Sequence, residues 1–196
     1  FALLKEKYPG LNLGCVGREE AKVMLVRSYI NAFGPVLEED VVWWTGFSRG
    51  EVKEMLAKME KELLYVKIGG FKGNYLMLKK DYEAFVEFKP SAKHSAVLLP
   101  FEDPYTKGYK IRNRLIGSSF EEKAYMGSGV QPTILFDGKI IGTWSRNIEE
   151  GRGPIKLRFF SRIDRDIERK FIEKAKAIGK VMSNHDVNIE SLQARV

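Results

Sequence analysis

One segment of the 196-residue sequence interleaves basic and aromatic side chains, a pattern that suits contact with nucleic acid. Lysine and arginine neutralise phosphates, and tyrosine rings can support a base or a sugar. The residues of this basic segment are Tyr105, Lys107, Tyr109, Lys110, Arg112 and Arg114. Tyr105 and Tyr109 are four positions apart and would share a face of a helical turn, although packing against a neighbouring sheet is an alternative for both. We predict that the segment contacts the phosphate backbone.

Asp103 is the acidic residue best placed for catalysis, because it lies in an irregular loop directly before the basic segment. A carboxylate there could orient a water molecule or stabilise a developing positive charge. The alternative, which the sequence favours, is that Asp103 caps the segment that follows or pairs with Arg112. Glu102 is expected to be a solvated neighbour. Asp103 is therefore a catalytic candidate with a structural alternative.

Several other chemistries are excluded by composition. The sequence has one cysteine, Cys15, and two distant histidines, His94 and His185, so no zinc set is expected. We see no phosphate-binding Gly-rich loop and no Ser/His/Asp arrangement, and we predict neither a metal nor another cofactor. No apolar stretch approaches the roughly 20 residues that span a bilayer. The start, at Phe1, shows no signal peptide, and we interpret the chain as a fragment of a longer cytoplasmic protein.

The positive charge is concentrated in one half of the chain. The net charge is +7, and residues 104–196 alone sum to +7, whereas residues 17–60 sum to −2. A basic surface attracts a polyanion by releasing its counterions, which makes double-stranded DNA the leading candidate partner. Arg146 belongs to a second basic group in this half. A lysine-rich solvated face is the alternative explanation of the charge.

Three helices are predicted in the first part of the chain. The first helix is expected between Gly17 and Phe33, and a shorter one over residues 37–44. The apolar residues that recur at helical spacing in the first helix, and so form its expected buried face, are Ala21, Met24, Leu25, Tyr29, Ala32 and Phe33. Ser48 precedes Glu51 by three positions, which is the pattern of a capping box. The third helix follows this box and has one apolar face, formed by Val52, Met55, Leu56, Met59 and Leu63.

A two-stranded hairpin follows the third helix, since apolar residues alternate over residues 64–68 and a returning strand is expected over residues 75–78. Three helices and a hairpin are typical of a winged helix, a variant of the helix-turn-helix. The third helix carries acidic as well as basic residues, which argues against insertion into a DNA groove. Lys67 and Lys72 at the tip of the wing are the better candidate DNA contacts, and packing alone is the alternative role of this module.

The second part of the chain is predicted to be rich in strands and to end in an amphipathic helix over residues 164–182. Asp137-Gly138 is a strong hairpin signal between two of its strands. The fold class is therefore α+β, with a winged helix followed by a β-rich, barrel-like domain with a C-terminal helix. The β-rich domain is expected to be a small barrel or, alternatively, a curled sheet with the helix packed on it. The predicted parts are a linker or upstream remnant (1–16), the winged helix (17–88), the β-rich domain (91–182) and a tail (183–196), with a break at Lys89-Pro90-Ser91.

Three motifs in order resemble the winged-helix DNA-binding family of AlkZ-like and YcaQ-like DNA glycosylases. They are Arg27-Ser28-Tyr29-Ile30-Asn31-Ala32-Phe33-Gly34-Pro35, followed by Trp43 or Trp44 and Gly46; Leu98-Leu99-Pro100-Phe101-Glu102-Asp103-Pro104-Tyr105-Thr106-Lys107-Gly108-Tyr109; and Pro132-Thr133-Ile134-Leu135-Phe136-Asp137-Gly138-Lys139-Ile140-Ile141-Gly142-Thr143-Trp144. Separated motifs in the right order are a stronger signal than any one alone.

The resemblance implies tandem winged helices followed by a β-barrel, shaped to hold duplex DNA, in proteins that excise alkylated bases and unhook interstrand crosslinks. This chain resembles the last winged helix plus the barrel. The family's catalytic signature, Gln, an apolar residue, then Gln or Asp, is expected upstream, since the only glutamines here are Gln131 and Gln193. The expected function is therefore DNA binding within a repair glycosylase, a hydrolase. The alternative is a non-catalytic winged-helix protein or transcriptional regulator.

Overall fold

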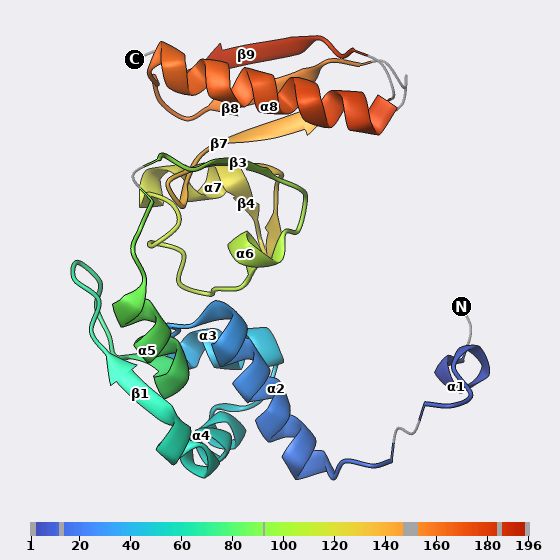
Figure 1. Ribbon diagram of the computed structural model, residues 1–196, viewed down its shortest axis with the longest axis vertical. Coiled ribbons are helices and arrows are strands. Elements are labelled where there is room, and N and C mark those ends of the chain that lie inside the picture. The colour runs from blue at the N-terminus through green and yellow to red at the C-terminus, as the bar shows by residue number, and fades with distance from the viewer. Residues whose placement is uncertain (1–2, 12–13, 92, 147–152, 184–185, 195–196) are drawn as a thin grey trace. The chain divides into compact units, whose positions relative to one another are not determined.

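The computed structural model describes residues 3–11, 14–91, 93–146, 153–183 and 186–194 (Figure 1). The chain divides into two units, Phe1–Phe88 and Lys89–Val196. Among the described residues, no helix is both long enough and apolar enough to cross a membrane.

The first unit contains helices and one hairpin. Its elements are α1 (Leu4–Lys7), α2 (Arg18–Phe33), α3 (Glu38–Thr45), α4 (Arg49–Lys58), η1 (Glu60–Glu62), β1 (Leu63–Val66), β2 (Tyr75–Leu78) and α5 (Lys79–Glu87). Strands β1 and β2 pair antiparallel, and Val36 forms a further bridge to Leu76 on β2. The third predicted helix and its apolar face are confirmed, because Val52, Met55 and Met59 are fully buried.

Helix α2 forms where the periodicity predicts it, but its buried face differs from the expected one. Val26, Tyr29 and Ile30 are buried, whereas Met24 and Leu25 remain exposed. The reason is that α2 contacts α3, α4 and β2, so its position among three elements decides which side chains are covered. Periodicity in the sequence indicates which side chains share a face of a helix, but not which elements pack against that face.

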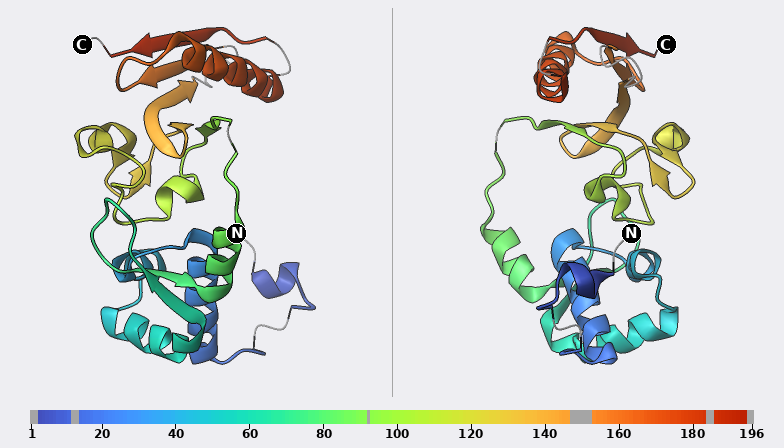
Figure 2. Two further views of the ribbon diagram at one scale, coloured as in Figure 1. Left: turned by 60° about the vertical axis from the view of Figure 1, so that its left-hand side comes forward. Right: turned by 90° about the vertical axis from the view of Figure 1, so that its right-hand side faces the viewer.

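The second unit is built on a five-stranded sheet. Its elements are β3 (Ala96–Leu99), α6 (Pro104–Lys107), η2 (Ser118–Phe120), α7 (Glu121–Ala124), β4 (Tyr125–Met126), β5 (Gly129–Val130), β6 (Thr133–Phe136), β7 (Lys139–Arg146), β8 (Ile155–Phe159), α8 (Arg165–Ser183) and β9 (Ile189–Gln193). The strand order of the main sheet is β3-β6-β7-β8-β9, and β4 and β5 form a separate hairpin. Figure 2 shows the same elements from two further sides.

The predicted barrel is wrong, because this sheet is open. Strands β3 and β9 are its two edges and do not pair with each other among the described residues. Helix α8 covers the sheet instead, where Phe171 and Ala175 pack into a core with Ile134, Ile155 and Leu157. An amphipathic helix that covers the apolar face removes the need for the sheet to close on itself.

The region predicted to be a tail contributes the last strand. Residues 189–193 form β9, which pairs parallel with β8. Parallel neighbours need a crossover connection, and α8 supplies it. Glu190 and Ser191 are adjacent polar residues and Gln193 is a third, so the apolar–polar alternation of a strand is absent and the sequence gives no strand signal here.

Candidate nucleic-acid interface

The two arginines of the basic segment are held inside the second unit. The Arg112 guanidinium lies 3.9 Å from the centroid of the Tyr125 ring, and the Arg114 guanidinium lies 4.1 Å from that of Tyr109. Arg112 also contacts Glu121 at 3.4 Å, and its side chain is only 12% exposed. Tyr109 is buried. The segment therefore folds inward at these positions through cation–π stacking, which is stronger away from water.

The remaining members of the basic segment lie at the surface. Tyr105 is exposed, Lys110 is exposed and Lys107 is half-buried and paired with Glu102. Tyr105 and Tyr109 do not share a helical face, because α6 ends at Lys107. The structure thus separates the segment into an outward part and an inward part.

Asp103 begins α6 as its N-cap. Its Oδ1 accepts a hydrogen bond from the Tyr105 backbone N–H at 2.9 Å, and Pro104 stands at the first helical position. The capping role weighed in the sequence analysis is therefore what the geometry shows. A carboxylate engaged in this way positions the loop and the outward part of the basic segment.

Glu102 is not the solvated neighbour expected from sequence, because two hydrogen bonds join it and its loop to Val130. Its Oε1 accepts from the Val130 N–H at 2.7 Å, while its own N–H donates to the Val130 carbonyl at 3.1 Å. Its φ of 58° is rare for a residue with a side chain, and the double contact to β5 holds it there. Sequence alone gave no signal for this conformation.

Tyr125 connects this loop to the stacked arginine. Its hydroxyl donates to the Thr106 carbonyl at 2.9 Å, and burial raises the pKa of Tyr125 to about 12, against the opposing effect of the Arg112 charge. The phenol therefore stays protonated and remains a hydrogen-bond donor. The Tyr125 and Arg112 pair serves to position the surface loop.

The other predicted DNA contacts lie at two separate places. Lys67 and Lys72 are exposed in the loop between β1 and β2, on the first unit. Arg146 is half-buried at the end of β7, where it faces Ile155 of β8 in the strand register. Lys67 and Lys72 are therefore more exposed than Arg146.

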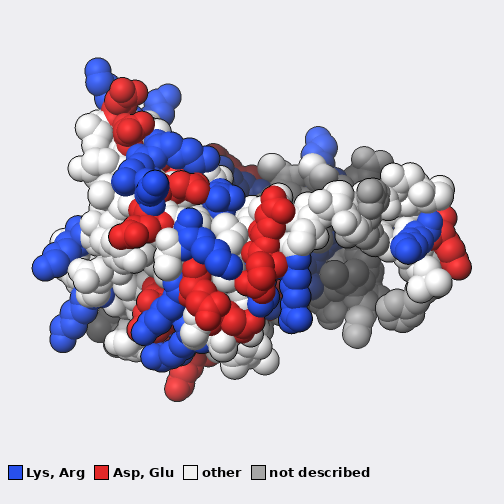
Figure 3. Space-filling model, turned by 90° about the horizontal axis from the view of Figure 1, so that it is seen from below, with Lys and Arg blue, Asp and Glu red and all other residues white. Residues whose placement is uncertain are grey.

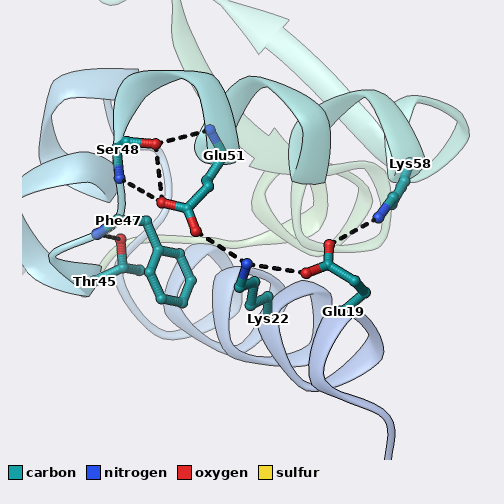
Figure 4. Close-up of polar contacts among 7 residues, drawn as sticks. All are labelled: Glu19, Lys22, Thr45, Phe47, Ser48, Glu51 and Lys58. Atoms are coloured by element: carbon teal, nitrogen blue, oxygen red, sulfur yellow. Dashed lines mark hydrogen bonds and ion pairs between the residues drawn. The ribbon is translucent and has the colours of Figure 1, made fainter.

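A polar network locks α4 to α2 (Figure 4). Ser48 and Glu51 form the predicted capping box, with the Ser48 N–H donating to Glu51 Oε2 at 2.9 Å and the Glu51 N–H donating to Ser48 Oγ at 3.2 Å. Lys22 of α2 lies 2.9 Å from both Glu51 and Glu19, and Glu19 also pairs with Lys58 at 3.3 Å. The Lys22 ammonium and the bonds from Ser48 lower the pKa of Glu51 to about 2.

This network neutralises basic residues that a groove-reading helix would need. Lys58 is engaged with Glu19, and acidic and basic side chains are interspersed over the face of the molecule seen in Figure 3. On α4 the exposed basic residues Arg49 and Lys53 stand beside the exposed Glu54. The mixed charge makes the exposed face of α4 a poor electrostatic match for a phosphate backbone.

One cluster was given no role by the sequence. His94 Nδ1 lies 2.7 Å from Asp137 Oδ2, next to a groove that His94 shares with Lys170 and Lys174. The residues are far apart along the chain, so their spacing carries no signal. The turn predicted at Asp137-Gly138 is the only sequence signal that lies at this cluster.

The fold and its surface define a mixed α/β protein of two units, with exposed basic side chains on each. A family model described as "DNA glycosylase AlkZ-like" matches residues 1–181, and the chain therefore belongs to the AlkZ-like DNA glycosylase family. The resemblance noted from the three sequence motifs is confirmed. No match was found among curated proteins.

A solved structure shows a similar fold. The chain is similar to the DNA glycosylase AlkZ of Streptomyces sahachiroi, with a TM-score of 0.72 and 20% sequence identity. The similarity covers 89% of this chain and 46% of that chain, so the present chain spans less than half the length of that protein.

Proposed function

We propose that this chain is the DNA-binding portion of a DNA-repair glycosylase that acts on alkylated or crosslinked bases in double-stranded DNA. Membership of the AlkZ-like family over residues 1–181 is the observation that carries the proposal. The charge of +7 over residues 104–196 is consistent with a polyanionic partner. A DNA-repair role is compatible with the cytoplasmic location expected from the sequence.

The proposal assigns residues 17–88 to a winged helix. Within this range α2, α3 and α4 precede the β1–β2 hairpin, and the Val36 N–H donates to the Leu76 carbonyl at 2.9 Å, which adds an isolated bridge to the hairpin. This is the element order of the winged variant of the helix-turn-helix. In this assignment Lys67 and Lys72 form the tip of the wing.

DNA contact is assigned to exposed side chains and not to every residue of the basic segment. Lys67 and Lys72 on the wing, with Tyr105, Lys107 and Lys110 on the second unit, are the proposed contacts to the backbone. Tyr109, Arg112, Arg114 and Arg146 are proposed to support this surface from within, since they are stacked or partly buried.

A non-catalytic DNA-binding protein is the second candidate, because neither glutamine of this chain stands in the triplet of the catalytic signature. The Gln131 side-chain amide donates to the Met126 sulfur at 3.0 Å. Gln193 donates to Glu168 at 2.8 Å and accepts from the Ile163 N–H at 3.1 Å. Both side chains therefore make contacts within the fold.

Base release separates the two candidates. The full-length protein is incubated with duplex DNA that carries an alkylated purine, and the free base is quantified, while binding of undamaged duplex by this chain is followed by fluorescence anisotropy. Release by the full-length protein and retention of DNA by this chain support the glycosylase. Binding without release by either would favour the regulator, and absence of binding would contradict both.

A further inference from the structure

An open groove with a volume of about 620 Å³ lies in the second unit between β3 and α8. Strand β3 pairs with β6 on one side only, so the groove runs along an edge of the sheet. His94 and Ser95, just before β3, and Val97 within it line one side of the groove. Lys170, Glu173 and Lys174 line it from the helix. Three of these side chains carry or can carry positive charge.

His94 is held in place although its side chain is 63% exposed. Its Nδ1 lies 2.7 Å from Asp137 Oδ2, and its ring stacks on Phe136 with centroids 5.1 Å apart. Asp137 is itself fixed, because its Oδ1 accepts from the Ser95 N–H at 2.7 Å and its own N–H donates to the Ser95 carbonyl at 2.9 Å. With Nδ1 directed to the carboxylate, Nε2 is the nitrogen left to bind an external group.

The two lysines stand one helical turn apart on α8, where like charges repel each other. Among the residues that the structure describes, neither Lys170 nor Lys174 forms a hydrogen bond or an ion pair. Glu173 lines the groove, and Asp137, which is engaged with His94, also interacts electrostatically with Lys170. A bound anion would relieve the repulsion and would meet lysine donors from the helix. The imidazolium form of His94, in which both ring nitrogens carry a proton, would add the Nε2–H as a donor from the other side of the groove.

We propose that this groove binds a phosphodiester group of the DNA backbone, through His94 on the strand side and Lys170 and Lys174 on the helix side. The inference rests on the proposed function for its choice of polyanion. The groove is open along its length, which suits a continuous strand better than a small enclosed ligand. The contact would position DNA without reading its sequence, as phosphate contacts do.

The test compares two double variants that remove the same charge from the same helix. Lys170→Gln with Lys174→Gln empties the groove of lysine, and Lys176→Gln with Lys180→Gln is the matched control at exposed positions outside it. Duplex affinity is measured over a range of salt concentrations. We expect the groove variant to bind about tenfold more weakly than the control, and its plot of log affinity against log salt to be flatter by roughly 1.8, which corresponds to two lost phosphate contacts.

Imidazole NMR supplies an independent readout, because the sequence has only two histidines and His185 serves as an internal reference. The His94 ring signals should shift on addition of a short DNA duplex to the wild-type chain and should shift much less in the groove variant. Inorganic phosphate is titrated in a parallel sample. A shift with phosphate but not with duplex would overturn the assignment to DNA in favour of a soluble phosphate ligand.

The possible outcomes distinguish a failure of the groove site from a failure of the proposed function. Equal losses in the two double variants, with the wild-type chain still binding duplex, would overturn the groove site and leave the proposed function standing. Failure of the wild-type chain to bind duplex would overturn both. A selective loss in the groove variant together with a His94 shift would support both.

Discussion

Alternating arginine and tyrosine side chains can face outward, where they could contact DNA, or stack on each other inside the protein. The contacts of each residue show which of the two arrangements it adopts. Arg112 stacks on Tyr125, which lies 13 positions further along the sequence and belongs to β4. Arg114 stacks on Tyr109 within the segment itself. Stacked guanidinium groups still carry their charge, so they contribute to the field around the loop while they fix its shape.

At the residue scale, the Glu51 carboxylate should make stability depend on pH. Its pKa is lowered from 4.5 to about 2 by Lys22 and Ser48. A carboxyl group with a lowered pKa in the folded state stabilises the fold fully above its unfolded value, and this contribution is lost as the pH falls. We therefore expect stability to decrease between pH 4.5 and about 2, as measured by urea unfolding at each pH.

The Glu51→Gln variant should lose less stability over that pH window than the wild-type protein, since the amide does not titrate. Glu54→Gln, at an exposed position on the same helix, is the matched control and should follow the wild-type curve. Identical curves for the wild-type protein and Glu51→Gln would show that the bond between Lys22 and Glu51 contributes no pH dependence.

At the scale of elements, the close approach of β7 and β8 depends on Gly142. A Cβ at this position would overlap the Arg158 carbonyl oxygen and lie 3.1 Å from the Phe159 Cα. These are backbone atoms and cannot move aside as a side chain does. We expect Gly142→Ala to lower the free energy of unfolding by about 1 to 3 kcal/mol, the usual range for overpacking.

Ser145→Ala, at an exposed position of the same strand, is the control for this prediction and should change stability by no more than about 0.5 kcal/mol. Both variants are compared by urea denaturation followed by circular dichroism. If Gly142→Ala is as stable as Ser145→Ala, the strands have room to separate and the contact is not a constraint.

Local signals predicted most of the elements, because those elements are determined by nearby residues. Ser48 and Glu51 act across three positions, and Asp137-Gly138 forms its turn within the β6–β7 hairpin, so both could be recognised from the sequence. The open sheet and the buried face of α2 could not be recognised from the sequence, because each depends on which element, distant along the chain, packs against it. The same limit applies to the candidate sites.

The candidate sites show this limit residue by residue. Asp103 was recognised as a cap candidate because a cap is local. The role of Glu102 depends on Val130, and the place of His94 depends on Asp137 and on α8. The predicted DNA contacts therefore stay predictions, and the structure changes which of them lie at the surface.

At the scale of the whole molecule, the division into two units should be visible to a protease. Trypsin does not readily cleave between Lys89 and Pro90, but Lys93 lies exposed a few residues beyond. We expect limited trypsin treatment to cut after Lys93 first and to leave two resistant fragments, identified by mass spectrometry. Lys93→Gln should delay that cut. Early cleavage within both units, or protection at Lys93, would contradict the division.

The parallel pairing of β8 with β9 has a consequence for synthesis on the ribosome. Strand β8 is made before the nineteen-residue helix α8, and its partner β9 comes only after that helix. Until residue 193 has left the exit tunnel, one edge of β8 stays without its neighbour and is available to other chains. A stalled or shortened product that ends before β9 would therefore be prone to aggregate.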